Sequence, residues 1–199
     1  MAQKIILASG SATRQQMLKS AGVSFDVVVA RIDEDMVKAA LEAEQAKPRE
    51  IADTLAEMKA RKVSDKFPEA LVIGCDQVLD LGGAVLSKPD SPEAAITQLK
   101  QMRGKRHSLL SAVVICEGGR PIWRHVGQVR MLMRPLTDGC IDEYVARNWE
   151  SIQHSVGAYK LEEEGMRLFS KVEGEYFCVL GLPLLELLSY LILRGDLQQ

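Results

Sequence analysis

Apolar positions along the chain follow two different periods, which predict strands and helices in succession. Short apolar or β-branched runs over residues 5–8, 23–29 and 71–79 predict strands, and the runs over 107–116 and 121–133 predict a hairpin around Gly118-Gly119. Helical spacing covers 14–21, two segments between 36 and 66 separated by Pro48, and then 92–103, 138–148 and 183–193. In the helix after Pro48, Ile51, Leu55 and Met58 mark the apolar face. The order of elements predicts a single α/β domain over residues 1–199.

Composition narrows the class of ligand. The chain has 199 residues, 47% of them hydrophobic, which is typical of a globular protein with a substantial core. Its formal net charge is -2, with acids and bases interspersed. A protein that binds nucleic acid or an anionic membrane normally carries a basic face, so we expect neither partner. A small polar ligand fits this composition better.

Two further features bear on the compartment. No apolar run approaches the roughly 20 residues that span a bilayer, and the first residues lead directly into a strand, so we expect a cytoplasmic protein. The four cysteines, Cys75, Cys116, Cys140 and Cys178, are far apart and lack C-x-x-C spacing. We expect all four to be reduced and none to bind zinc.

The first segment with candidate chemistry joins the first strand to the first helix. It reads Ser9-Gly10-Ser11-Ala12-Thr13-Arg14. The start of a helix presents unpaired backbone N–H groups and the positive end of the dipole, which favours an anion such as phosphate. The guanidinium of Arg14 could bind two phosphate oxygens at once. The alternative is a turn with Ser11 as helix N-cap and no ligand.

The second segment places a carboxylate inside an apolar run. Asp76 follows Gly74-Cys75 in a predicted strand, and a buried carboxylate needs a partner or a metal. It could instead cap a turn near Gly82-Gly83, but Val78 and Leu79 still continue the apolar run after it.

Several charged residues allow two interpretations each. Asp33-Glu34-Asp35 either begins a helix in solvent or offers a carboxylate to a divalent cation. Lys59 is either solvated or turned into a cleft, and Glu162-Glu163-Glu164 is most simply a solvent-facing turn. His107 is more typical of a surface or packing residue than of a catalyst, and Lys105 and Arg106 would keep it neutral.

An ordered set of motifs resembles one known family over nearly the whole chain. The motifs are Leu7-Ala8-Ser9-Gly10-Ser11-Ala12-Thr13-Arg14, Gly74-Cys75-Asp76-Gln77-Val78, Ser87-Lys88-Pro89, Gly104-Lys105-Arg106-His107, Gly157-Ala158-Tyr159, and Glu173-Gly174 with Val179-Leu180-Gly181-Leu182-Pro183-Leu184. Their order and spacing resemble those of the Maf-like nucleotide pyrophosphatases.

The resemblance implies an α/β fold of the Maf or inosine triphosphatase type, with an elongated mixed β-sheet flanked by helices and two lobes around a central cleft. It also implies a homodimer that uses a divalent metal cation, Mg²⁺ or Mn²⁺. The substrate would be a nucleoside triphosphate, hydrolysed to the monophosphate and pyrophosphate to remove modified nucleotides from the pool.

The same resemblance implies roles for individual residues. Asp76 would accept the proton and, with Glu34, bind the metal, while Ser9, Arg14, Lys59 and Lys88 would hold the phosphate chain. Thr13, Gln77 and Glu162 would discriminate the base. Gln77, Lys160 and Glu162 resemble the branch directed at 7-methyl-GTP.

Three departures from the family pattern leave alternatives open. Ala12, Thr13 and Gln15 replace a loop that usually reads close to Ser-Pro-Arg-Arg, so one expected cation is missing. Leu110-Ser111-Ala112 replaces the usual Thr-Gly, and Glu163-Glu164 replaces a Gly. A nucleotide-binding regulator of cell division with little turnover and a dTTP/UTP pyrophosphatase are therefore the alternatives. A dinucleotide-dependent oxidoreductase is disfavoured because the loop lacks G-x-G-x-x-G.

Overall fold

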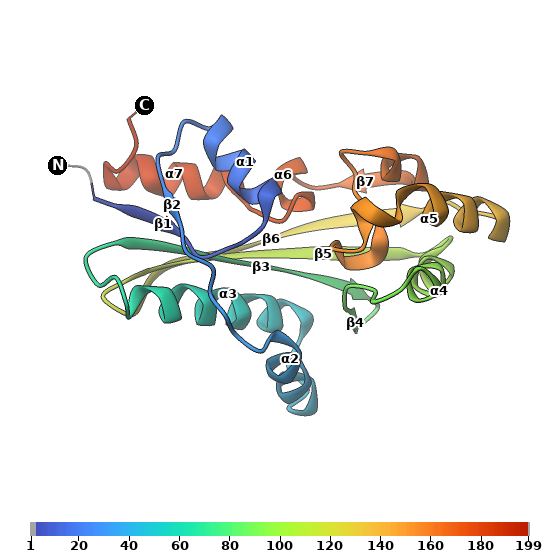
Figure 1. Cartoon of the computed structure of the whole chain (residues 1–199), viewed down its shortest axis with the longest axis horizontal. Coiled ribbons are helices and arrows are strands. Elements are labelled where there is room, and N and C mark those ends of the chain that lie inside the picture. The colour runs from blue at the N-terminus through green and yellow to red at the C-terminus, as the bar shows by residue number, and fades with distance from the viewer. Residues whose placement is uncertain (1–2, 199) are drawn as a thin grey trace.

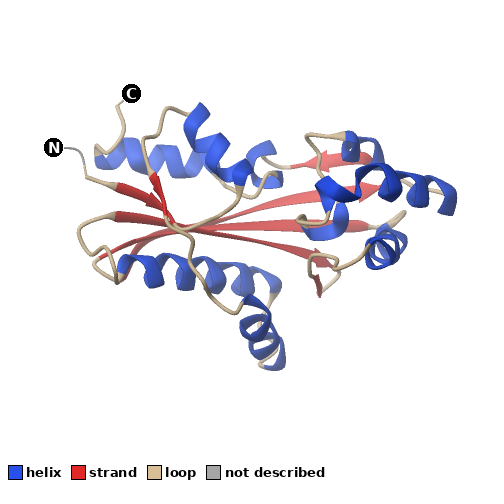
Figure 2. Ribbon diagram, viewed as in Figure 1, coloured by secondary structure: helices blue, strands red, loops and turns tan. Residues whose placement is uncertain are grey.

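A computed structural model of the chain describes residues 3–198. Within that range it contains seven strands, seven α-helices and two short 3₁₀ helices (Figures 1 and 2). The strands are β1 (Ile5–Leu7), β2 (Asp26–Val27), β3 (Leu71–Leu81), β4 (Ala84–Leu86), β5 (Arg106–Glu117), β6 (Arg120–Met133) and β7 (Phe169–Glu173). The helices are α1 (Ala12–Ser20), α2 (Glu34–Ala43), α3 (Pro48–Ser64), α4 (Pro92–Met102), α5 (Asp138–Ile152), η1 (Val156–Ala158), η2 (Glu164–Leu168), α6 (Tyr176–Val179) and α7 (Leu184–Arg194).

All seven strands belong to one mixed sheet, in the order β2-β1-β3-β5-β6-β7, with β4 paired to the end of β3. β1 is parallel to β2 and β3, whereas the β3, β5, β6 and β7 pairs are antiparallel. The long central strands run through the whole molecule (Figure 2). The predicted α/β class and the elongated mixed sheet are confirmed, and the division into two lobes stays a prediction.

Helices cover both faces of the sheet and form three hydrophobic clusters with it. Leu55 and other residues of α3 pack on one face, against Val72 and Val114. Leu18 of α1 and Leu187 of α7 pack on the opposite face. α4 and α5 cover the far ends of β3, β5 and β6 (Figure 1). Burial on both faces explains why β3 and β5 have nearly continuous apolar sequences.

One edge of β3 is left unpaired in the middle of the sheet. β1 ends at Leu7, opposite Ile73, and β4 pairs with β3 only from Leu79 onward. Residues 74–78 therefore have a strand neighbour, β5, on one side only. Successive side chains on a strand point to opposite faces, so Asp76 points toward α3 and Gln77 toward α6.

A glycine lets α3 approach this part of β3 closely. A Cβ at Gly74 would lie 2.3 Å from the Ala56 carbonyl oxygen and 2.6 Å from the Ala60 nitrogen. No side chain fits there without moving the helix, so Gly74 permits the short distance across which α3 contacts Asp76.

Two sequence predictions are wrong in detail. The run over 23–29 forms only the two-residue strand β2, because Val23 packs into the cluster beside α1 whereas Val28 packs into the cluster beside α3. Met58 does not lie on the buried face of α3 and is 37% exposed. Small residues, such as Ala56 and Ala60, form that face instead.

The remaining predictions about elements agree with the structure. Pro48 begins α3, Ser91 caps α4, and β5 and β6 form the expected hairpin. All four cysteines are free thiols, and only Cys140 is exposed. Among residues 3–198, no helix is both long enough and apolar enough to cross a membrane.

Candidate active site

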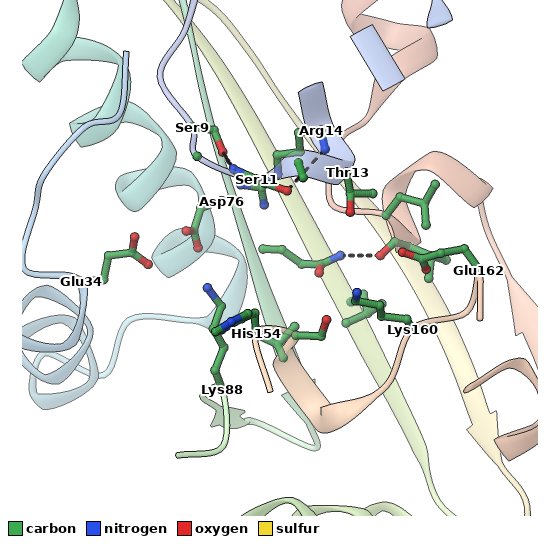
Figure 3. A pocket seen from close by; sticks show the side chains of 18 of the residues that line it. Ser9, Ser11, Thr13, Arg14, Glu34, Asp76, Lys88, His154, Lys160 and Glu162 are labelled. Atoms are coloured by element: carbon green, nitrogen blue, oxygen red, sulfur yellow. Dashed lines mark hydrogen bonds between the residues drawn. The ribbon is translucent and has the colours of Figure 1, made fainter. Parts of the chain in front are cut away.

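A cavity of about 750 Å³ opens beside the unpaired edge of β3. The nine residues to which the family resemblance assigns roles all line it: Ser9, Thr13, Arg14, Glu34, Lys59, Asp76, Gln77, Lys88 and Glu162. In Figure 3, Glu34, Asp76 and Lys88 lie on one side, Lys160 and Glu162 on the other, and the loop from Ser9 to Arg14 between them. The fold thus brings together residues that are as much as 153 positions apart, from Ser9 to Glu162.

The loop before α1 is held by its own polar side chains. Ser11 is the N-cap, as expected, and accepts a hydrogen bond from the Arg14 backbone N–H. Nε of Arg14 donates to the Gly181 carbonyl at 2.7 Å, and Nη1 donates to Ser9 Oγ and to the Cys75 carbonyl at the open edge of β3. These bonds orient the guanidinium and leave Nη2 without a partner among the described residues.

A lysine between two carboxylates lies at one end of the cavity. Lys59 Nζ is 2.7 Å from Asp76 Oδ1 and 2.8 Å from Glu34 Oε1. Lys59 is 8% exposed and Asp76 4%, so both are buried charges that stabilise each other. Of the two interpretations of Lys59, a cation turned into a cleft is the one observed.

The acidic cluster at the start of α2 divides between the two expected roles. Asp33 is the N-cap and accepts from the Met36 N–H, whereas Glu34 turns into the cavity. Partial burial raises the pKa of Glu34, but the hydrogen bond from Lys59 and the charges of Lys59, Lys88 and Lys38 outweigh it and hold this pKa below its ordinary value. Glu34 is therefore ionised at neutral pH.

The two carboxylates are suited to a hard divalent cation. Each uses one oxygen for Lys59, and Asp76 Oδ2 is buried without a hydrogen-bond partner in the described structure. Residues 3–198 contain no group of three or more His, Cys, Asp or Glu placed to bind a metal. Mg²⁺ commonly uses one or two carboxylates and takes its other ligands from substrate phosphates and water, so two carboxylates are enough.

Lys88 adds a cation with no ion-pair partner among the described residues. It follows β4 and lies near Glu34 and Asp76 (Figure 3). Loss of hydration in the cavity lowers the pKa of Lys88, the nearby charge of Glu34 raises it, and those of Arg14 and Lys59 lower it further. Like charges held close together in this way favour binding of a polyanion.

The three acids over 162–164 separate in the structure. Glu163 accepts from Ser151 and Lys160, and Glu164 accepts from Arg147 and Asn148. Glu162 alone lines the cavity, and none of the described residues donates a hydrogen bond to its carboxylate. Glu162 is exposed and lies in a turn, as expected, and it also borders the cavity.

The side-chain amide of Gln77 offers only its oxygen atom to the cavity. Its Nε2 contacts the carbonyl oxygens of Cys178 and Val179 at 2.9 and 3.0 Å and Ser111 Oγ at 3.0 Å. A carbonyl can only accept, so the nitrogen is fixed on that side, and Oε1 remains as an acceptor for a ligand.

Some lining residues were not identified from the sequence, among them Lys38 and His154. Lys38 lies one helical turn after Glu34, a spacing that places both on one face of α2 and could have indicated it. His154 follows the end of α5 and reaches the cavity only through the turn after that helix, for which the sequence contains no signal.

His107 lies outside the cavity. It is 3% exposed, and its Nε2 lies 2.9 Å from the Tyr159 hydroxyl, so it is a packing residue. Burial lowers the pKa of His107 to about 4. The expected neutral state is correct, but desolvation, rather than the charges of Lys105 and Arg106, is its cause.

Comparisons with known proteins point to one family. The family model described as Maf-like protein matches residues 4–193. The chain is 66% identical over 197 residues to the nucleoside triphosphate pyrophosphatase of Roseobacter denitrificans, covering 99% of both chains. It is 65% identical over 195 residues to the protein of the same name from Ruegeria pomeroyi, covering 98% of both. It is also 47% identical over 191 residues to the 7-methyl-GTP pyrophosphatase of Brucella abortus, covering 96% of both. A match this extensive, over the residues that build both the sheet and the cavity, means that the chain belongs to the Maf-like protein family.

Proposed function

We propose that this protein is a nucleoside triphosphate pyrophosphatase, which hydrolyses a triphosphate to the monophosphate and pyrophosphate. The observation that carries the proposal is the Glu34–Lys59–Asp76 cluster, which shares one cavity with Arg14 and Lys88. The names of the relatives from Roseobacter denitrificans and Ruegeria pomeroyi support the same activity.

The distribution of charge suits a triphosphate. Such a substrate carries about four negative charges, and cleavage adds charge to the bridging oxygen, so most of the catalytic effect is electrostatic. Arg14 and Lys88 have no carboxylate partner in the described structure, and Ser9 adds a hydroxyl donor beside Arg14. We assign these three residues, with Lys59, to the phosphate chain.

Asp76 is the proposed proton acceptor. Hydrolysis at the α-phosphorus needs a water in line with the leaving pyrophosphate and a base near that water. Oδ1 of Asp76 is held by Lys59, and Oδ2 has no protein partner among the described residues. A buried carboxylate with one fixed and one open oxygen can orient a water and accept its proton.

We also propose that Glu34 and Asp76 hold a divalent cation, Mg²⁺ or Mn²⁺. When bound, it would offset negative charge on the phosphate chain. Titration calorimetry of Mn²⁺ with the protein and with Glu34→Gln tests this separately from turnover, since loss of the carboxylate should weaken binding.

For the base we propose 7-methylguanine. Guanine offers N1–H and N2–H donors on one edge, which the Glu162 carboxylate can accept as a pair, and N7 methylation makes the ring cationic. Gln77 Oε1 is a further acceptor, and Thr13 lies at the same cavity. The name of the Brucella abortus relative supports this choice. Removal of such a nucleotide from the pool is the role that we propose.

A panel of nucleotides tests the proposal. The wild-type protein, with Mg²⁺ or Mn²⁺, should release pyrophosphate from 7-methyl-GTP with a higher kcat/KM than from GTP, UTP or dTTP. Asp76→Asn should reduce kcat by about 10²–10⁴-fold while the nucleotide still binds, because a positioned general base has an effect of that size. Asp80→Asn is the matched control, since Asp80 lies in the same strand but accepts from the Gly83 N–H in a turn.

Each alternative gives a different result in this panel. Binding without pyrophosphate release would favour a nucleotide-binding regulator of cell division. Release of pyrophosphate preferentially from UTP or dTTP would support the proposed activity but contradict 7-methyl-GTP as the substrate. Turnover by Asp76→Asn within about tenfold of wild type would remove Asp76 from the role of base.

We propose a homodimer on the family resemblance alone. Sedimentation equilibrium of the purified chain, whose protomer mass is 22.0 kDa, should give twice that mass. A mass that remains that of one protomer as concentration rises would contradict it.

A further inference from the structure

Ser111 is a fully buried hydroxyl that lies outside the cavity but beside it. It belongs to β5 and is the direct cross-strand partner of Gln77 in β3, so the two side chains lie on the same face of the sheet. A buried hydroxyl costs free energy unless its hydrogen bonds are made. The hydrogen bonds of the Ser111 hydroxyl among the described residues lead to Gln77 and to α6.

The direction of these bonds is determined by chemistry. Ser111 Oγ lies 2.6 Å from the Cys178 carbonyl oxygen, which can only accept, so the single hydroxyl proton of Ser111 is directed there. Ser111 Oγ must then accept in its contact of 3.0 Å with Gln77 Nε2. Ser111 thus joins the amide of Gln77 to the backbone of α6.

This arrangement disfavours a 180° flip of the Gln77 side-chain amide. A reversed amide would place Oε1 against the carbonyl oxygens of Cys178 and Val179 and against a hydroxyl oxygen whose proton is already used. The two carbonyl contacts would then be repulsive, and Ser111 could donate to Oε1 only by giving up its bond to Cys178. Gln77 can therefore offer only Oε1 to the cavity, where a nucleobase must supply a donor.

We infer that Ser111 is a positioning residue for base recognition, which acts through Gln77 and makes the cavity prefer guanine, whose amino group has a second N–H to donate to Oε1, over uracil, whose single N3–H lies between two carbonyl oxygens. The inference rests on the proposed function for the identity of the ligand. It extends that function by naming the feature of the base that is required, a hydrogen-bond donor, and the residue that enforces it. A base that presents a carbonyl oxygen there is rejected.

Binding measurements can test this without turnover. The α,β-methylene analogues of GTP and UTP cannot be cleaved at the α-phosphorus, so calorimetry gives the ratio of their dissociation constants directly. Ser111→Ala should reduce the preference for the guanine analogue about fivefold to tenfold, the effect of one net hydrogen bond. Ser64→Ala is the matched control: Ser64, the last residue of α3, is also fully buried, but it accepts from the Gly119 N–H in the turn between β5 and β6, and its loss should leave the ratio unchanged.

A second variant separates positioning from general destabilisation. In a Gln77→Leu background, Ser111→Ala should cause no further change in the ratio, because the residue through which it acts is gone. The inference is overturned if Ser111→Ala keeps the wild-type ratio within about twofold, if the two changes are additive, or if the wild type binds both analogues equally. Failure of the proposed function is seen separately, as absence of pyrophosphate release from natural nucleotides.

Discussion

Arg14, Lys59 and Lys88 all bring positive charge to the cavity, but their surroundings differ. Lys59 is paired with Glu34 and Asp76, and Arg14 is held by the neutral oxygens of Ser9, Cys75 and Gly181. Lys88 has no ion-pair or hydrogen-bond partner among the described residues. A substrate would therefore gain charge-assisted bonds from Lys88 without breaking existing ones, which makes its effect the simplest to measure.

Lys88→Ala should weaken binding of every nucleoside triphosphate by about tenfold to a hundredfold, since a hydrogen bond to a charged group contributes roughly 1.5–3 kcal/mol. The ratios between bases should not change, because an ammonium group recognises charge. Calorimetry with GTP and UTP measures both quantities, and Lys66→Ala, an exposed lysine on another surface, is the control. A change in base preference would place Lys88 near the base instead.

Glu162→Gln should lower the preference for 7-methyl-GTP over UTP by about 1–3 kcal/mol, the discrimination of one bidentate base contact. The amide keeps the shape but loses the charge and one acceptor. The ratio of kcat/KM for the two nucleotides gives the result. Glu164→Gln is the control, because Glu164 is bonded to Arg147 and Asn148 outside the cavity. An unchanged ranking would mean that Glu162 does not contact the base.

At the scale of elements, the site depends on how closely α3 lies against β3. The small residues Ala56 and Ala60 face Gly74, and this close packing places Lys59 within 2.7 Å of Asp76. The positions of Asp76, the proposed general base, and of its partner Lys59 are therefore set by backbone packing between α3 and β3. A change two residues from Asp76 can disturb the site without touching any cavity residue.

Gly74→Ala should destabilise the protein by about 1–3 kcal/mol and reduce turnover of the folded fraction, because the added methyl group overpacks the interface and shifts α3. Urea denaturation and kcat measured on the same sample separate the two effects. Gly139→Ala is the control, since a Cβ at Gly139 in α5 meets no atom within 4 Å. Normal activity and stability of Gly74→Ala would show that α3 can move without cost.

At the scale of the whole molecule, stability should depend on pH through His107. Its pKa is about 4 in the folded protein against an ordinary value of 6.5, because burial disfavours the imidazolium. Below about pH 6.5 the unfolded chain therefore binds a proton that the folded chain does not. The contribution of neutral His107 to the stability of the folded protein is therefore complete above about pH 6.5 and is lost as the pH falls toward 4.

Between about pH 7 and pH 4.5 this one group should lower the free energy of unfolding by about 2–3 kcal/mol. Urea denaturation at the two pH values measures it. His107→Gln should be less stable near pH 7 but lose less on acidification, whereas His154→Gln, at an exposed position, should behave like the wild type. Equal losses in His107→Gln and the wild type would assign the acid sensitivity to other groups.

The sequence by itself determined the order of the main elements, apart from the short β4, β7 and α6, and indicated residues that line the cavity. Local signals suffice for this purpose: Pro48 and Ser91 mark helix starts, and the apolar run around Asp76 shows that its carboxylate is buried. The nine candidate residues, although recognised partly through family resemblance, all reach one cavity.

Only the tertiary structure decided which partner each side chain meets. That Lys59 lies between two carboxylates, that Glu162 rather than Glu163 faces the cavity, and that Ser111 fixes Gln77 depend on contacts between distant segments. The split of the 23–29 run between two hydrophobic clusters and the burial of His107 have the same origin. A periodic pattern reports that a residue is buried, but its neighbours follow from strand register and from how closely helices pack on the sheet.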